Sequence, residues 1–108
     1  MKPDNPILIV DDEEDTLNSF AFTLKFENIN NLVLCNDARK VMPLLRENVY
    51  SLILLDLFMP HVSGEQLLME IHDNYPEIPV IIITGNNKVE TAVDCMKTGA
   101  YELYGKTR

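Results

Sequence analysis

Five side chains in this 108-residue sequence have types that suit phosphoryl chemistry. They are three carboxylates, a hydroxyl and an ammonium group: Asp11, Asp12, Asp56, Thr84 and Lys106. Carboxylates that lie close together repel one another, and they stay ionised cheaply only when a cation sits among them. If these carboxylates meet, we therefore expect a hard divalent cation between them.

Magnesium is the cation that this set of ligands favours. Oxygen ligands without a nearby histidine or thiolate suit Mg²⁺, which typically takes one or two carboxylates plus a phosphate oxygen. An aspartate beside Mg²⁺ and a fixed lysine can attack phosphorus and form an aspartyl phosphate. Lys106 and the metal would neutralise the phosphoryl oxygens, and Thr84 can donate its hydroxyl to the attached group. The acidic run at residues 13–15 is expected instead to form the solvated start of a helix.

The elements that must bring these groups together alternate along the chain. Four short aliphatic stretches are typical of parallel strands buried on both faces, and a fifth stretch is weaker. These stretches are residues 7–10, 31–35, 51–55, 80–83 and 102–105. Helix-like segments lie between them, which predicts an α/β fold with a doubly wound parallel sheet. In such a sheet the ligand site lies outside the carboxyl ends of the strands, where we expect the five groups to converge.

The segments between these stretches carry signals typical of helices. Leu17 and Leu24 belong to an apolar stripe at helical spacing after the first strand. Residues 37–47 predict a second helix, in which Pro43 lies too far inside for a first-turn proline and should kink the helix or delay its start. Ser63 is the predicted cap of a third helix.

Composition and charge exclude several classes of protein. With 46% hydrophobic and 24% charged residues, the chain is expected to form one globular domain over residues 1–108. No apolar stretch is long enough to span a membrane and no secretory signal is evident, so we expect a cytoplasmic protein. The formal net charge of −8 repels phosphate backbones, which argues against direct contact with nucleic acid. Cys35 and Cys95 are expected to be reduced thiols.

Four segments in order resemble the receiver domain of response regulators in two-component signal transduction. They are Val10-Asp11-Asp12-Glu13, the segment 56–64, Ile83-Thr84-Gly85 and the segment 96–102 that leads to Lys106. The resemblance covers nearly the whole chain and is strongest to receivers of transcriptional activators that drive an ATPase. It implies a flavodoxin-like sheet of five parallel strands in the order 2-1-3-4-5.

The resemblance also implies a role for each site residue. Asp56 would accept a phosphoryl group from a sensor histidine kinase and bind Mg²⁺ directly together with Asp12. Asp11 would hold the metal mainly through water, and the Phe58 carbonyl would complete the protein ligands. The remaining two groups match the family's switch hydroxyl, Thr84, and its phosphate-binding lysine, Lys106. The protein would therefore be a switch that phosphorylates and slowly dephosphorylates itself, and not a metabolic enzyme.

The sequence departs from the family pattern near its end. Leu103 stands where the family usually keeps an aromatic residue, and Thr107 stands in place of a proline after the lysine. The residues stop at Arg108, so we expect neither the fifth helix nor an output domain. One sheet face would then lack cover, and Phe22 and Phe26 could join it to a second copy of the chain. Alternatively, the two phenylalanines are simply tolerated at the surface.

These departures leave a second function open. A degenerate receiver would act as a binding or dimerisation module that does not depend on phosphorylation. A flavin-binding carrier of the same fold is disfavoured because the acidic run at 11–15 would repel the cofactor phosphate. An aspartyl-phosphate hydrolase would usually carry a second acid where Phe58 stands.

Overall fold

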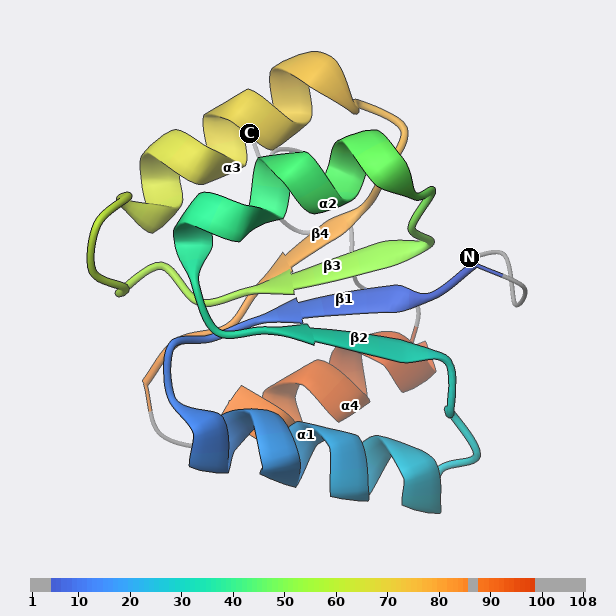
Figure 1. The fold of residues 1–108 in the computed structure, drawn as a ribbon. Coiled ribbons are helices and arrows are strands. Elements are labelled where there is room, and N and C mark those ends of the chain that lie inside the picture. The colour runs from blue at the N-terminus through green and yellow to red at the C-terminus, as the bar shows by residue number, and fades with distance from the viewer. Residues whose placement is uncertain (1–4, 86–87, 99–108) are drawn as a thin grey trace.

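Strands and helices alternate in the computed structural model, which describes residues 5–85 and 88–98 (Figure 1). The strands are β1 (Ile7–Val10), β2 (Leu32–Cys35), β3 (Leu52–Leu55) and β4 (Val80–Ile82). The helices are α1 (Glu14–Phe26), α2 (Val41–Glu47), α3 (Gly64–Asn74) and α4 (Lys88–Thr98), and a short 3-10 helix, η1 (Ala38–Lys40), precedes α2. Within these described ranges, no helix combines the length and the apolar character needed to cross a bilayer.

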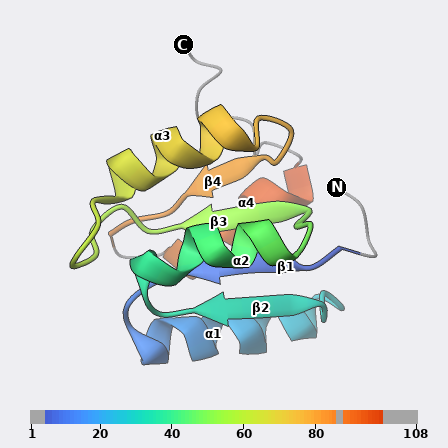
Figure 2. The same ribbon diagram turned by 45° about the horizontal axis from the view of Figure 1, so that its top comes forward.

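The described strands form one parallel sheet in the order β2-β1-β3-β4 (Figure 2). Val10, at the end of β1, lies opposite Cys35 of β2 and Leu55 of β3, so these strands end at the same edge of the sheet. The α/β class and the relative order of the first four strands are confirmed. The predicted fifth strand, residues 102–105, lies outside the described residues.

Helices cover both faces of the sheet. Figure 1 shows α2 and α3 on one face and α1 and α4 on the other. Along the central strands the side chains alternate between two apolar clusters: Leu8 and Leu55 pack on the α2 and α3 side, and Ile9 and Leu54 on the α1 and α4 side. Every residue of β1 and β3 is buried, as the continuous aliphatic runs predict.

The bare sheet face that the sequence analysis predicts is not found along β1 and β3. Their residues are at most 3% exposed, because α1 and α4 already close that face. Large apolar side chains are exposed elsewhere, at Leu34 on the edge strand β2 and at Phe22 and Phe26 on α1. The two phenylalanine rings pack edge to face, with centroids 5.6 Å apart. That they join a second copy of the chain stays a prediction.

The start of α2 agrees with the effect predicted for Pro43. Residues 38–40 form the 3-10 turn first, and α2 begins at Val41, so the proline falls within the first helical turn. Asp37 caps this turn by accepting the Arg39 backbone N–H at 2.9 Å, and it also pairs with the Arg39 guanidinium at 2.8 Å. The hydrogen bonds from Arg39 hold the pKa of the Asp37 carboxyl well below its usual range.

The start of α3 is packed closely against the beginning of the loop that follows β3. Ser63 Oγ accepts the Gln66 backbone N–H at 3.0 Å, which confirms the predicted cap. The Gly64 N–H donates to the Leu57 carbonyl at 3.1 Å. A Cβ atom on Gly64 would lie 2.3 Å from the Leu57 Cα, so only glycine fits here without a backbone shift.

Replacing Gly64 with alanine is expected to lower the free energy of unfolding by about 1–3 kcal/mol. Alanine is ordinarily the better helix residue, but here its methyl group must push the Leu57 backbone away. Urea unfolding followed by circular dichroism measures the change. Gln66→Ala, at an exposed position two residues later, should change stability by less than about 0.5 kcal/mol. An unaltered unfolding midpoint for Gly64→Ala would show that the Leu57 backbone moves aside without a loss of stability.

Candidate functional site

Two buried aspartates stand side by side at the carboxyl edge of the sheet. Asp11 follows β1 and Asp56 follows β3, and the residues before them, Val10 and Leu55, are partners in the parallel register. The Asp56 N–H donates to the Val10 carbonyl at 3.1 Å, which continues the pairing by one residue. Asp11 is 0% exposed and Asp56 is 4% exposed. Burial of two acids in contact with an apolar core is costly, so each needs compensating partners.

Backbone N–H groups fix one oxygen of each buried carboxylate. Asp11 Oδ1 accepts the Glu13 N–H at 3.0 Å, and Asp56 Oδ1 accepts the Phe58 N–H at 3.1 Å. Both bonds join residues two apart, the local turn that aspartate readily forms after a strand. The Oδ2 atom of each carboxylate is left for a cation.

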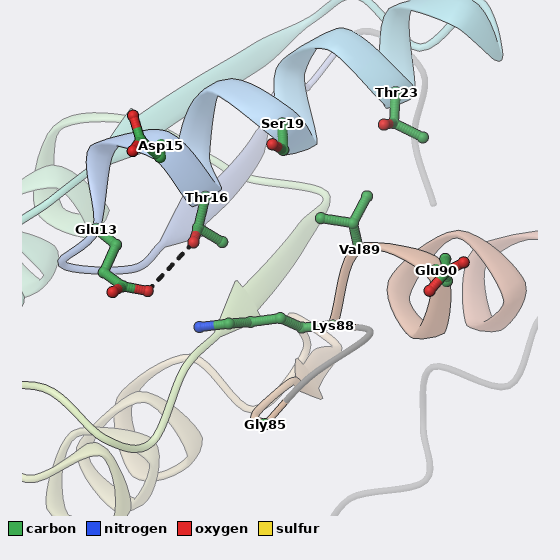
Figure 3. Close-up of a pocket in the computed structure, with 9 residues that line it drawn as sticks. All are labelled: Glu13, Asp15, Thr16, Ser19, Thr23, Gly85, Lys88, Val89 and Glu90. Carbon is green, nitrogen blue, oxygen red and sulfur yellow. Dashed lines mark hydrogen bonds between the residues drawn. The ribbon is translucent and has the colours of Figure 1, made fainter.

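Lys88 supplies a cation to both of these Oδ2 atoms. Its Nζ donates to Asp11 Oδ2 at 2.7 Å and to Asp56 Oδ2 at 3.1 Å. In Figure 3 the lysine side chain extends from the start of α4 toward the start of α1, and it is 15% exposed. Burial of the ammonium group acts to lower the pKa of Lys88, but the hydrogen bonds to Asp11 and Asp56 outweigh burial and raise the pKa above its usual value.

A third carboxylate completes an acidic cluster at this edge. Asp12 is exposed, and ligand oxygens of Asp11, Asp12 and Asp56 all lie within 4.8 Å of one another. The three carboxylates therefore meet, as the strand–helix alternation leads one to expect. Hard oxygen donors with an exposed member suit Mg²⁺, which keeps several of its waters. That these three residues bind the metal stays a prediction.

Of the other three predicted site residues, the structure describes Thr84 and Phe58. Thr84 is exposed and lies two residues beyond β4, next to Ile83, whose N–H donates to the Leu55 carbonyl at the end of β3. Phe58 has a side chain that is 75% exposed and a backbone N–H that holds Asp56. Lys106, and with it the two departures at positions 103 and 107, lies outside the described residues.

The site residue that the sequence analysis missed is Lys88. It was not singled out because a lysine in the first turn of an expected helix is ordinarily a surface residue. A signal was nevertheless present: Lys88 is four residues beyond Thr84, at the start of the helix that follows the fourth strand. Helix starts and strand ends share one edge in this fold, so a long side chain there can reach the carboxylates.

Comparison with known proteins agrees with this geometry. The sequence model of the family described as "Response regulator receiver domain" matches residues 7–107. The chain belongs to this family. This is the family that the four sequence segments indicated. Receiver domains act as signalling switches in two-component systems.

Relatives and solved structures show the same family. The chain is 40% identical over 102 residues to "Putative response regulator NtrX-like" of Rickettsia bellii, covering 93% of this chain and 21% of that protein. It is 38% identical over 96 residues to "Transcriptional regulatory protein ZraR" of Escherichia coli, covering 89% and 22% of the two chains. The solved receiver domain of NtrX from Brucella abortus is 34% identical, with a TM-score of 0.68 over 88% of this chain and 80% of that one.

The matched relatives are much longer than this chain. The chain spans about a fifth of the length of the curated relatives it matches. Their names agree with the expected likeness to receivers of transcriptional regulators. The described chain accounts for the receiver part of such proteins.

Proposed function

We propose that this receiver domain accepts a phosphoryl group on Asp56 from a sensor histidine kinase, in a reaction that depends on Mg²⁺. The observation that supports this most is the position of Asp56, a buried carboxylate at the end of β3 that lies beside two further carboxylates. A carboxylate in such a setting is held in one orientation, with one oxygen directed toward the site where a phosphoryl donor would arrive.

The transfer needs few groups from the protein. Asp56 Oδ2 attacks phosphorus, the new P–O bond forms, and the P–N bond to the kinase histidine breaks, so that the imidazole leaves with the electron pair. The Phe58 N–H keeps Oδ1 of the same carboxylate in place during the attack. Most of the catalysis is positioning and charge neutralisation, as in phosphoryl transfer generally.

The acidic cluster fits Mg²⁺ by the chemistry of its donors. Asp12 and Asp56 would hold the metal directly, Asp11 would hold it mainly through water, and the Phe58 carbonyl would add a neutral oxygen. When bound, Mg²⁺ supplies positive charge to the oxygens of the transferring phosphoryl group. Without that charge the carboxylates would repel the anionic donor.

Two further residues complete the proposal. Thr84 would donate its hydroxyl to the phosphoryl group, and Lys106 would bind its oxygens. Thr84 lies beyond β4 at the same edge as Asp56, in a position compatible with this role. The product is a labile acyl phosphate, and the altered surface near α4 would be presented to a partner. In this account the domain is a switch and not a metabolic enzyme.

Phosphorylation by a small acyl phosphate tests the proposal without knowledge of the kinase. We expect that incubation with acetyl phosphate and Mg²⁺ adds one phosphoryl group, visible by intact-protein mass spectrometry, and that the group is lost again on standing. Chelation of Mg²⁺ with EDTA should abolish the adduct, because the charge on the oxygens is then not neutralised. Absence of an adduct in the presence of Mg²⁺ would contradict the proposal.

A degenerate receiver remains the second candidate, and one observation favours it. Lys88 already pairs with both buried carboxylates and compensates part of their charge without any external cation. A domain of this kind would bind its partner whether or not phosphate is supplied. The same mass measurement distinguishes the two functions, since a degenerate receiver gives no adduct.

A further inference from the structure

Lys88 contacts two of the three carboxylates that would surround a metal ion in the acidic cluster. In both buried aspartates Oδ1 accepts a backbone N–H, so it is Oδ2 that faces the cluster. The Lys88 ammonium binds both Oδ2 atoms, at 2.7 Å on Asp11 and 3.1 Å on Asp56. One internal cation thus bridges the ends of β1 and β3.

An ammonium group and a magnesium ion cannot share these oxygens. Magnesium binds oxygen at about 2.0–2.1 Å, so an ion held by the Asp56 carboxylate lies within a few ångströms of the present Nζ position. Two cations at that separation in a largely buried site repel each other strongly. Binding of Mg²⁺ therefore requires the lysine to withdraw.

The groove beside the site offers the withdrawn ammonium a new place. This groove of about 590 Å³ runs between α1 and α4 and includes Lys88 among its lining residues. Three carboxylates also line it, those of Glu13, Asp15 and Glu90 (Figure 3). The lysine can thus replace its contacts with two buried acids by contacts with exposed ones, which lowers the free-energy cost of its withdrawal.

Withdrawal of the lysine affects α4 because Lys88 is its first residue. Val89 and Ala92 of this helix pack in the apolar cluster that contains Phe20 of α1, and Ala92 is 0% exposed. In the present state two charge-assisted hydrogen bonds tie the first turn of α4 to β1 and β3. Loss of both bonds releases that turn from the sheet edge.

We propose that Lys88 is an internal counter-ion that Mg²⁺ displaces, so that the first turn of α4 responds to the occupancy of the Asp11–Asp56 pair. This inference rests on the proposed function, because it takes Mg²⁺ as the ion that enters the cluster. It identifies a residue that sets the metal affinity of the domain and couples the site to α4.

Isothermal titration with Mg²⁺ alone tests the role of the lysine directly. Lys88→Gln removes the competing charge, so it should bind Mg²⁺ at least about tenfold more tightly than the parent. Lys88→Arg keeps a cation at the same position and should stay within about threefold of the parent. Lys25→Gln is the matched control: it removes the same charge from the opposite end of α1, about 16 Å along the helix from its start, and should leave the affinity unchanged.

Nuclear magnetic resonance supplies a second readout. Addition of Mg²⁺ to the parent should shift the backbone amide signals of Val89 and Ala92. The shift should shrink in Lys88→Gln, because this variant lacks the ion pairs that Mg²⁺ would break. Equal affinities for the parent and Lys88→Gln would overturn the inference while leaving the proposed function intact. If neither protein binds Mg²⁺, the proposed function fails, and the inference fails with it.

Discussion

Replacing Asp56 with asparagine is expected to reduce phosphorylation by acetyl phosphate by at least about 100-fold, because a neutral amide is a poor nucleophile toward phosphorus. The substitution keeps the size of the side chain and leaves an oxygen able to accept the Phe58 N–H. Loss of the adduct would therefore report on chemistry and not on folding. Intact-protein mass spectrometry with Mg²⁺ present measures the fraction of phosphorylated protein.

A second aspartate serves as the matched control for Asp56→Asn. Asp73 is exposed near the end of α3, and Asp73→Asn removes the same charge. This variant should accept the phosphoryl group at the parental level. An adduct of equal size on Asp56→Asn would move the acceptor to another residue and end the assignment.

Truncation of Phe20 to alanine is expected to lower the free energy of unfolding by about 3–5 kcal/mol. The ring is 0% exposed and packs with Ile9 and Leu54 between α1 and the sheet, so its loss leaves a cavity. A domain of this kind is stable by only about 5–15 kcal/mol in total, so the variant should be close to unfolding. Urea unfolding followed by circular dichroism gives the change in stability.

The same helix carries the control for Phe20→Ala. Phe22 is two residues further along and 68% exposed, and Phe22→Ala should change stability by less than about 0.5 kcal/mol. Similar losses at the two positions would show that α1 packs through a different face. That result would also remove the α1 contact from the account of how α4 is held.

Local sequence signals were sufficient to predict most of this fold. Strands β1 and β3 contain no polar residue, and such aliphatic runs are typical of strands with helices on both sides. Pro43 delayed a helix start and Ser63 capped one, since both effects act within one turn of the chain. The meeting of Asp11 and Asp56 also followed, because parallel strands that pair in register end together.

Contacts between distant residues were harder to predict. The cover that α1 and α4 give to β1 and β3 depends on how two helices pack side by side, which helical periodicity alone does not specify. Lys88 was missed for a similar reason: a flexible side chain can turn to solvent or to the sheet edge, and the choice is made by the two carboxylates it meets. Sequence spacing places its Cα, whereas burial and charge decide the direction of its side chain.

A crystal structure with Mg²⁺ and beryllium fluoride, a mimic of the phosphoryl group, tests the central claim most directly. We expect the beryllium on Asp56 Oδ2 and the magnesium ion next to it, within reach of the Asp11 and Asp12 carboxylates. Beryllium fluoride bound to another residue, or a magnesium ion away from these three aspartates, would contradict the account.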